Sequence, residues 1–112
     1  MLLIDLSGFA NALDSLPHIM EARDIVGTQS HKSVYCLVDV SESRFNVDVV
    51  EALKDLAIHN QPFVIASAVI GVTGLKRVIL EGVVKVTGRT NLKPLPSREA
   101  AFGWLAAQSE QV

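Results

Sequence analysis

Short apolar runs alternate with segments of helical spacing along the whole chain, and this alternation constrains the fold more than any other feature. Several runs are continuous and rich in β-branched residues, as the buried strands of parallel sheets are. We predict strands over residues 2–6, 34–40, 63–70 and 91–95. We predict helices over residues 16–27, 47–59 and 74–87, followed by a last helix that begins after Ser97. Four successive strand–helix units predict an α/β domain with a small, mostly parallel sheet, helices packed on it and right-handed crossovers.

Particular residues mark the ends of these elements. Pro17 suits the first turn of the first helix. Asn46 and Ser97 can cap the second and the last helix with their side chains. Pro94 lacks a backbone N–H, so the final strand is expected at an edge of the sheet. The first helix is the least regular of the four, because Arg23 falls among its apolar residues.

The size and composition of the chain fit one globular domain, residues 1–112. Its 112 residues are 49% hydrophobic and 20% charged, which is ordinary for a folded protein and unlike a disordered one. No apolar run approaches the roughly 20 residues that cross a bilayer, and the start MLLIDLSGF lacks the basic lead of a signal peptide. The one cysteine, Cys36, cannot form a disulfide within the chain. We therefore expect a cytoplasmic protein without a membrane segment.

Charge is distributed unevenly although the total is small. The net charge of −2 gives no reason to expect nucleic-acid binding. Residues 1–60 carry four basic and nine acidic side chains, a net charge of −5, whereas residues 61–112 carry six basic and three acidic ones, a net charge of +3. This asymmetry fits ordinary solvated helix faces, and it also fits a field that orients a charged partner.

Residues that could support catalysis or bind a metal are few and scattered. His18, His31 and His59 do not share the spacing that places two ligands on one helix face. Cys36 lies in an apolar strand, where a thiol is usually inert packing. The chain contains neither a nucleophile elbow nor a phosphate-binding lysine loop. We expect no enzyme activity, no metal and no cofactor.

The loop at residues 71–74 is a candidate for anion binding. Gly71, Thr73 and Gly74 connect the end of a predicted strand to the start of a helix. Free N–H groups at such a position favour anions, and ligands of open α/β sheets gather beyond the carboxyl ends of strands. The dinucleotide fingerprint is missing, however, and two glycines with a threonine cap are also common in plain turns.

The helix over residues 74–87 offers a second candidate surface. Leu80 and Val84 lie one turn apart among basic residues and are expected to project away from the sheet. They could contact a partner or a second copy of the chain, giving a homodimer; alternatively, a neighbouring helix covers them. The inward face of this helix is then expected to consist of Leu75, Val78, Ile79, Gly82, Val83 and Val86.

Residues 33–107 resemble the STAS domains, the family that includes the bacterial anti-sigma-factor antagonists. The resemblance begins with LVDVSESRF at 37–45, which is similar to the strand and loop of the family, and continues with VVEALKDLA at 49–57. SAVIGVTGLKRVI at 67–79 and SREAAFGWLA at 97–106 resemble the later strand–helix junction and the closing helix, as in small bacterial STAS-like (SpoIIAA-like) proteins.

The chain departs from this family at the phosphorylation motif. Antagonists carry D-S-S/T-G at the start of the helix after the loop, whereas this chain has Val47-Asp48-Val49-Val50 there, without a hydroxyl. Asp48 stands near the place of the phosphorylated residue, or is simply a favourable first-turn residue. Ser41 and Ser43 remain conceivable phosphosites. The family also usually opens with two strands before its first helix, and one is evident here.

The resemblance implies a non-enzymatic module that binds a protein partner, such as an anti-sigma-type regulator. The implied surface combines the loop at 41–48, the helix after it and the junction at 71–77. The residues expected to contact the partner are Ser41, Ser43, Arg44, Asn46, Asp48, Leu80 and Val84. The alternative is a domain that binds a nucleotide, anion or lipid at the carboxyl ends of the strands, near residues 67–74.

Overall fold

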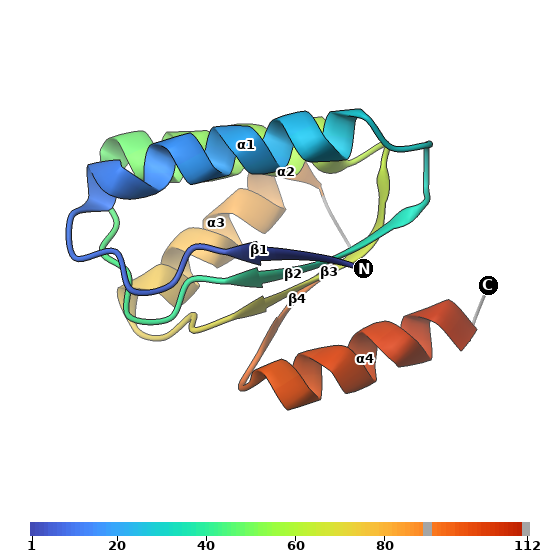
Figure 1. Cartoon of the computed structure of the whole chain (residues 1–112). Helices are drawn as coiled ribbons and strands as arrows, with labels where there is room; N and C mark the ends of the chain where they lie inside the picture. Colours follow the sequence, from blue (N-terminus) through green and yellow to red (C-terminus); the bar gives the residue numbers. More distant parts are fainter. Residues whose placement is uncertain (89–90, 111–112) are drawn as a thin grey trace.

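The computed structural model describes residues 1–88 and 91–110 and has strands and helices in alternation (Figure 1). A short 3₁₀ helix, η1, precedes the first α-helix. The elements in chain order are β1 (Leu2–Asp5), η1 (Ala12–Ser15), α1 (Leu16–Gly27), β2 (Val34–Asp39), α2 (Val47–Asn60), β3 (Val64–Ile70), α3 (Leu75–Thr87), β4 (Leu92–Leu95) and α4 (Arg98–Glu110). The predicted α/β fold of alternating strands and helices is confirmed.

The four strands form one parallel sheet in the order β1-β2-β3-β4, the same order as in the sequence. Because parallel crossovers are right-handed, a sheet that grows in one direction receives all its crossover helices on one face. Helices α1, α2 and α3 accordingly cover one face, and α4 returns along the other face after the last strand (Figure 1). The molecule therefore has three layers, with the sheet in the middle.

Each face of the sheet has its own hydrophobic core. Alternate residues of β2 point to opposite faces, so Cys36 packs beneath α1 and α2 while Leu37 packs beneath α4. Both side chains are almost fully buried. Among the described side chains of α4, Ala101 and Leu105 are buried and Trp104 packs beside them, as predicted. The continuous apolar run in β2 is thus explained by burial on both faces.

Several local predictions are confirmed by hydrogen bonds. The Asn46 side chain accepts a hydrogen bond of 2.8 Å from the Val49 N–H, and Ser97 Oγ accepts one of 3.1 Å from the Ala100 N–H. Pro94 lies in β4, at an edge of the sheet. In the first helix Arg23 is exposed. Its apolar neighbour Met20 is exposed as well, and the buried face consists of Ile19, Ala22 and Val26.

The predicted orientation of α3 is right for Ile79 and Val83, which face the core side, and wrong for other residues. Leu80, expected to project away from the sheet, packs against the core, whereas Val78, expected to face inward, is 64% exposed. The face of α3 that packs against the core therefore lies closer to Lys76 than the sequence predicted. The aliphatic part of the Lys76 side chain faces inward, although its charge suggested a place on the polar side. Val84 is half-buried, and the side chains of Leu75 and Val86 lie outside the described part of the structure.

Within residues 1–88 and 91–110, no helix combines the length and apolar character that crossing a membrane would require.

Candidate functional site

The loops after the first three strands lie together at the carboxyl edge of the sheet. Backbone hydrogen bonds continue between them beyond the strands themselves: the Leu6 N–H donates to Asp39 O (2.7 Å), the Gly8 N–H to Ser41 O (2.9 Å) and the Val40 N–H to Ile70 O (3.0 Å). These loops therefore form a continuation of the sheet, which gives the side chains on them fixed positions.

Gly71 allows the loop after β3 to pass close to the loop after β2. Its φ is +83°, and a Cβ atom there would lie 2.4 Å from the backbone N and Cα of Ser41. Only glycine fits such an approach without displacing the neighbouring backbone. The contact explains Gly71 structurally, without a bound anion.

The two serines of the loop at 41–48 are engaged in the structure of the loop. Ser43 is buried, and its Oγ accepts a 3.0 Å hydrogen bond from the Phe9 N–H and donates one to Leu6 O. The Ser41 N–H donates to Asp39 Oδ1 at 2.9 Å, and Ser41 is half-buried. Ser43 thus connects the loops after β1 and β2, and its hydroxyl is shielded from solvent.

A charged cluster, not predicted from the sequence, connects the sheet to α4. Arg98 donates to Asp39 Oδ2 from Nε (3.1 Å) and Nη2 (2.8 Å), and its Nη2 lies 3.6 Å from Asp5 Oδ2. Burial alone would raise the pKa of Asp39, but hydrogen bonds from Ser41 and Arg98 outweigh it and hold this pKa below its usual value. The Asp39 side chain is 7% exposed, whereas those of Arg98 and Asp5 are 42% and 53% exposed, so the cluster joins a buried carboxylate to the surface.

A groove of about 680 Å³ opens between the start of α2 and the start of α3. We call it the α2–α3 groove. Its walls combine apolar, basic and acidic side chains, and Val47 stands at its rim with 77% of its surface exposed. The residues that line it are Ser43, Arg44, Phe45, Asn46, Val47, Val50, Glu51, Thr73, Lys76 and Ile79.

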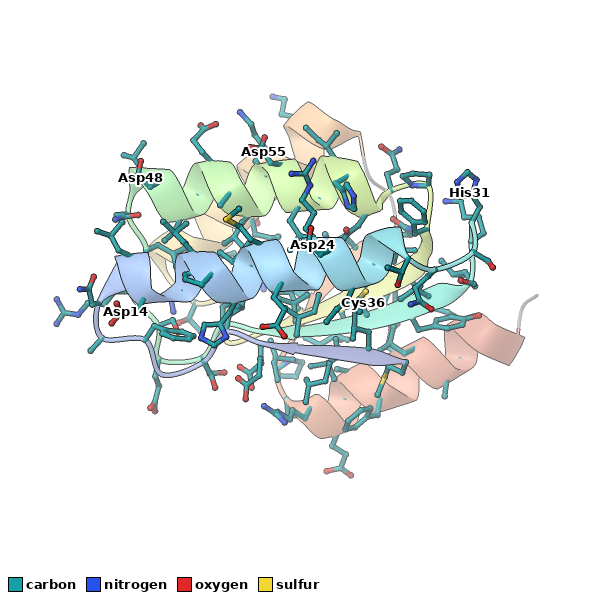
Figure 2. All side chains as sticks on the ribbon, turned by 45° about the horizontal axis from the view of Figure 1, so that its top comes forward. Asp14, Asp24, His31, Cys36, Asp48 and Asp55 are labelled. Atoms are coloured by element: carbon teal, nitrogen blue, oxygen red, sulfur yellow. The ribbon has the colours of Figure 1, made fainter. Side chains whose placement is uncertain are left out.

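The α2–α3 groove brings together some of the predicted site residues and leaves others outside. Ser43, Arg44, Asn46 and Thr73 line it, although Ser43 contributes from a buried position and Asn46 also caps α2. Asp48 is exposed at the start of α2, at the outer end of the helix layer, and does not line the groove (Figure 2). Ser41, Gly71, Gly74, Leu80 and Val84 are also outside its lining.

The side chain of Lys76, a residue of α3, forms part of the floor of the α2–α3 groove. Its Nζ donates to Val40 O at 2.8 Å and lies 5.1 Å from the centre of the Phe45 ring, a cation–π contact. Burial lowers the pKa of Lys76, and the nearby Asp39 charge opposes this effect. Lys76 and Phe45 lie within the predicted segments 71–77 and 41–48, but neither was singled out as a site residue. Their contact depends on the orientation of α3, which the sequence did not reveal.

Beneath the α2–α3 groove lies a smaller cavity of about 80 Å³, between the sheet and helices α2 and α3. Most of its walls are aliphatic, with Val38, Leu53 and Val69 among them. Cys36 forms part of the wall and is almost fully buried, which agrees with a packing role for this thiol. The cavity shares Phe45, Lys76 and Ile79 with the groove above it.

The histidines pack against phenylalanine rings. His31 and His59 both contact Phe63, with ring centres 5.2 and 5.6 Å from its ring centre, and His18 contacts Phe9 with ring centres 5.1 Å apart. His31 and the start of α2 are at opposite ends of the helix layer (Figure 2). Among the residues that the structure describes, no three His, Cys, Asp or Glu side chains are grouped so that they could hold a metal ion.

The strand order bears on the alternative of an anion site at residues 71–74. Ligands of open α/β sheets usually bind where the strand order reverses and adjacent loops diverge. Here the order does not reverse. Gly74 occupies the N-cap of α3 without a side-chain hydrogen bond, so Thr73 is not the cap that the sequence suggested, and it faces the groove instead.

Comparisons with known proteins add no relative. No family model, no curated protein and no solved structure matches this chain.

Proposed function

We propose that this chain is a non-enzymatic, STAS-like interaction module that binds a protein partner in the α2–α3 groove. The observation that carries the proposal is that the 41–48 loop, the start of α2 and the 71–77 junction together form one groove of about 680 Å³. These are the three segments that the resemblance to STAS domains implies for partner contact. The relation of this chain to the STAS domains is also part of the proposal.

The groove has the composition of a protein-binding surface rather than of a catalytic centre. Its lining combines the apolar side chains of Phe45, Val47 and Ile79 with charged ones, namely Arg44, Glu51 and Lys76. Protein interfaces commonly combine apolar contacts with polar ones. A partner that inserts an apolar side chain beside Val47 and presents a carboxylate to Arg44 fits this arrangement.

The proposal does not include a phosphorylation switch. The segment 47–50 carries no hydroxyl, and Ser43 is buried with its Oγ engaged in two hydrogen bonds. Mass spectrometry of the protein isolated from its own cells tests this point. Stoichiometric phosphate at Ser41 or Ser43 would contradict the proposal of a phosphate-independent module.

The partner can be sought by affinity capture with matched variants as baits. Val47→Glu places a charge in the groove, and Val78→Glu makes the same change at an exposed valine of α3 outside the groove lining. We expect wild type and Val78→Glu to enrich the same protein from a lysate of the source cells. Enrichment of that protein by Val47→Glu should be at least tenfold lower. Equal capture of that protein by all three baits, or capture by none of them, would contradict the groove as the binding site.

The proposed setting is a reducing cytoplasm, which agrees with a single, deeply buried cysteine. A homodimer built on Leu80 and Val84 is not proposed, because Leu80 packs against the core of its own chain.

A further inference from the structure

The cavity below the α2–α3 groove is an unusual feature for so small a domain. Protein interiors are packed to the density of organic crystals, and the few voids within them rarely exceed the size of a water molecule. This cavity measures about 80 Å³ and lies against the central strands β2 and β3, where packing would be expected to be tightest. Its walls are mostly aliphatic, with Val38, Leu53 and Val83 among them, and Asn60 and Ser67 are the uncharged polar residues of the lining, so water finds few hydrogen-bond partners there.

A cation lies at the boundary between this cavity and the groove. Lys76 lines both, as do Phe45 and Ile79. An ammonium group has three N–H donors, and the hydrogen bond to Val40 O uses one of them. The ammonium group therefore lies where the groove meets the apolar cavity.

We propose that the cavity binds the hydrocarbon end of a small free carboxylate, whose carboxylate group pairs with Lys76 in the floor of the groove. Dry apolar cavities bind small apolar molecules, as a cavity of about 150 Å³ binds benzene. The present cavity is smaller, so a short unbranched chain fits it better than a ring or a long acyl chain. The charge of Lys76 selects an anion over a cation of the same length.

The proposed ligand also explains why a lysine faces the core side of α3. An ammonium beside an apolar cavity loses hydration, and the backbone carbonyl, the aromatic ring and the nearby Asp39 charge offset only part of this loss. A carboxylate at the same place supplies a charged hydrogen-bond acceptor. This inference rests on the cavity and on Lys76, and it stands independently of the protein partner proposed above.

Titration of the whole chain with three six-carbon probes tests the proposal. Hexanoate, hexan-1-ol and hexylammonium share a chain and differ in the charge of the head group. We expect hexanoate to bind at least tenfold more tightly than hexan-1-ol, and hexylammonium to bind more weakly than both. Shortening hexanoate by one methylene should weaken binding about fourfold.

Methyl NMR spectra locate the bound probe. Resonances of Leu53 and Val69, which line the cavity, should shift on addition of hexanoate, whereas those of the exposed Val78 and Ile25 should not. Absence of shifts at Leu53 and Val69, or equal binding of hexanoate and hexylammonium, would overturn the proposal.

Two variants separate the head group from the chain. Lys76→Met keeps an apolar stem and removes the charge, so the affinity for hexanoate should fall to that for hexan-1-ol, while Arg77→Met, at an exposed neighbour, should bind like wild type. Ala57→Leu fills the cavity from α2 and should abolish binding of all three probes. If Ala57→Leu fails to fold, Lys76→Met still tests the proposal. Unchanged binding of hexanoate to Lys76→Met would refute the role of Lys76.

Discussion

At the residue scale, the carboxyl edge of the sheet depends on side chains that are small or fully hydrogen-bonded. Gly71 lets two loops touch through their backbones, and Ser43 connects two loops through one hydroxyl. Neither requirement is visible in the sequence, because each depends on a segment more than 25 residues away. The helix caps Asn46 and Ser97 were predictable because their partners lie three residues along the chain.

Replacing Gly71 with alanine should destabilise the protein by about 2 kcal/mol or more, since the positive φ is strained for alanine and its Cβ would collide with Ser41. Gly103→Ala is the matched control, because Gly103 lies in α4 with no atom within 4 Å of an added Cβ. The control should gain about 0.5–1 kcal/mol from the better helix propensity of alanine. Urea denaturation measures both, and a neutral Gly71→Ala would show that the two loops are not in contact.

Ser43→Ala removes the hydroxyl that pairs with Phe9 and Leu6, so two backbone groups lose a partner. We expect a loss of about 1–3 kcal/mol in the free energy of unfolding. Ser33→Ala is the comparison, because the Ser33 hydroxyl makes an exposed hydrogen bond to Ser30 O and its loss should change stability by less than about 0.5 kcal/mol. Equal effects of the two substitutions would argue against a structural role for the Ser43 hydroxyl.

At the element scale, α3 and α4 differ in how well the sequence predicts them. The bounds of α3 followed from its glycines and its spacing, but its orientation did not, because hydropathy counts Lys76 as polar although its stem lies in the core layer. The inward face of α4 was predicted from Ala101, Trp104 and Leu105. The hydrogen bonds by which Arg98 attaches α4 to the sheet could not be predicted, because Arg98 and Asp39 are 59 residues apart.

The attachment of α4 should make the stability of the protein sensitive to acid. The pKa of Asp39 is lowered in the folded chain, so its ion pair contributes fully above the unfolded pKa of about 4 and is lost as the pH falls through the folded pKa. We expect the free energy of unfolding of wild type to decrease steeply below about pH 4. Asp5, whose pKa is lowered first by its hydrogen bonds from Ser7, adds to the same slope.

Asp39→Asn should lower stability at pH 7 by about 2 kcal/mol and should flatten the slope below about pH 4, leaving the part due to Asp5. Glu81→Gln is the control, because it breaks an exposed pair with Arg77 at 3.6 Å and should change stability by less than about 0.5 kcal/mol. Urea titrations at several pH values measure both. An acid slope that is identical in wild type and Asp39→Asn would rule out this carboxylate as its source.

At the scale of the whole molecule, each strand pairs with the strand next to it in sequence. The pairs Leu2–Cys36, Cys36–Ser67 and Ser67–Leu92 are separated by 34, 31 and 25 residues. The class of fold was predictable because every strand–helix unit repeats the same local pattern and pairs with the unit next to it. The α2–α3 groove was predictable only as a set of three segments, since its shape depends on the orientation of α3.

Hydrogen exchange should reveal the same architecture. Amides of β2 and β3 lie between neighbours on both edges and beneath helices on both faces, so they should exchange most slowly. Amides of β1 and β4 are each paired on one side only within the described sheet and should exchange faster. Protection that is uniform over all four strands would indicate that the chain opens only as a whole.

The strands alone resemble a very short solenoid, because each is hydrogen-bonded only to the strands next to it in sequence. The last repeat departs from that arrangement, since α4 packs against Leu37 of β2 and Arg98 contacts Asp5 and Asp39. The groove and the cavity are built mainly from the two interior repeats, β2–α2 and β3–α3. Displacement of α4 would therefore uncover one face of the central strands, while the groove and the cavity lie on the other face.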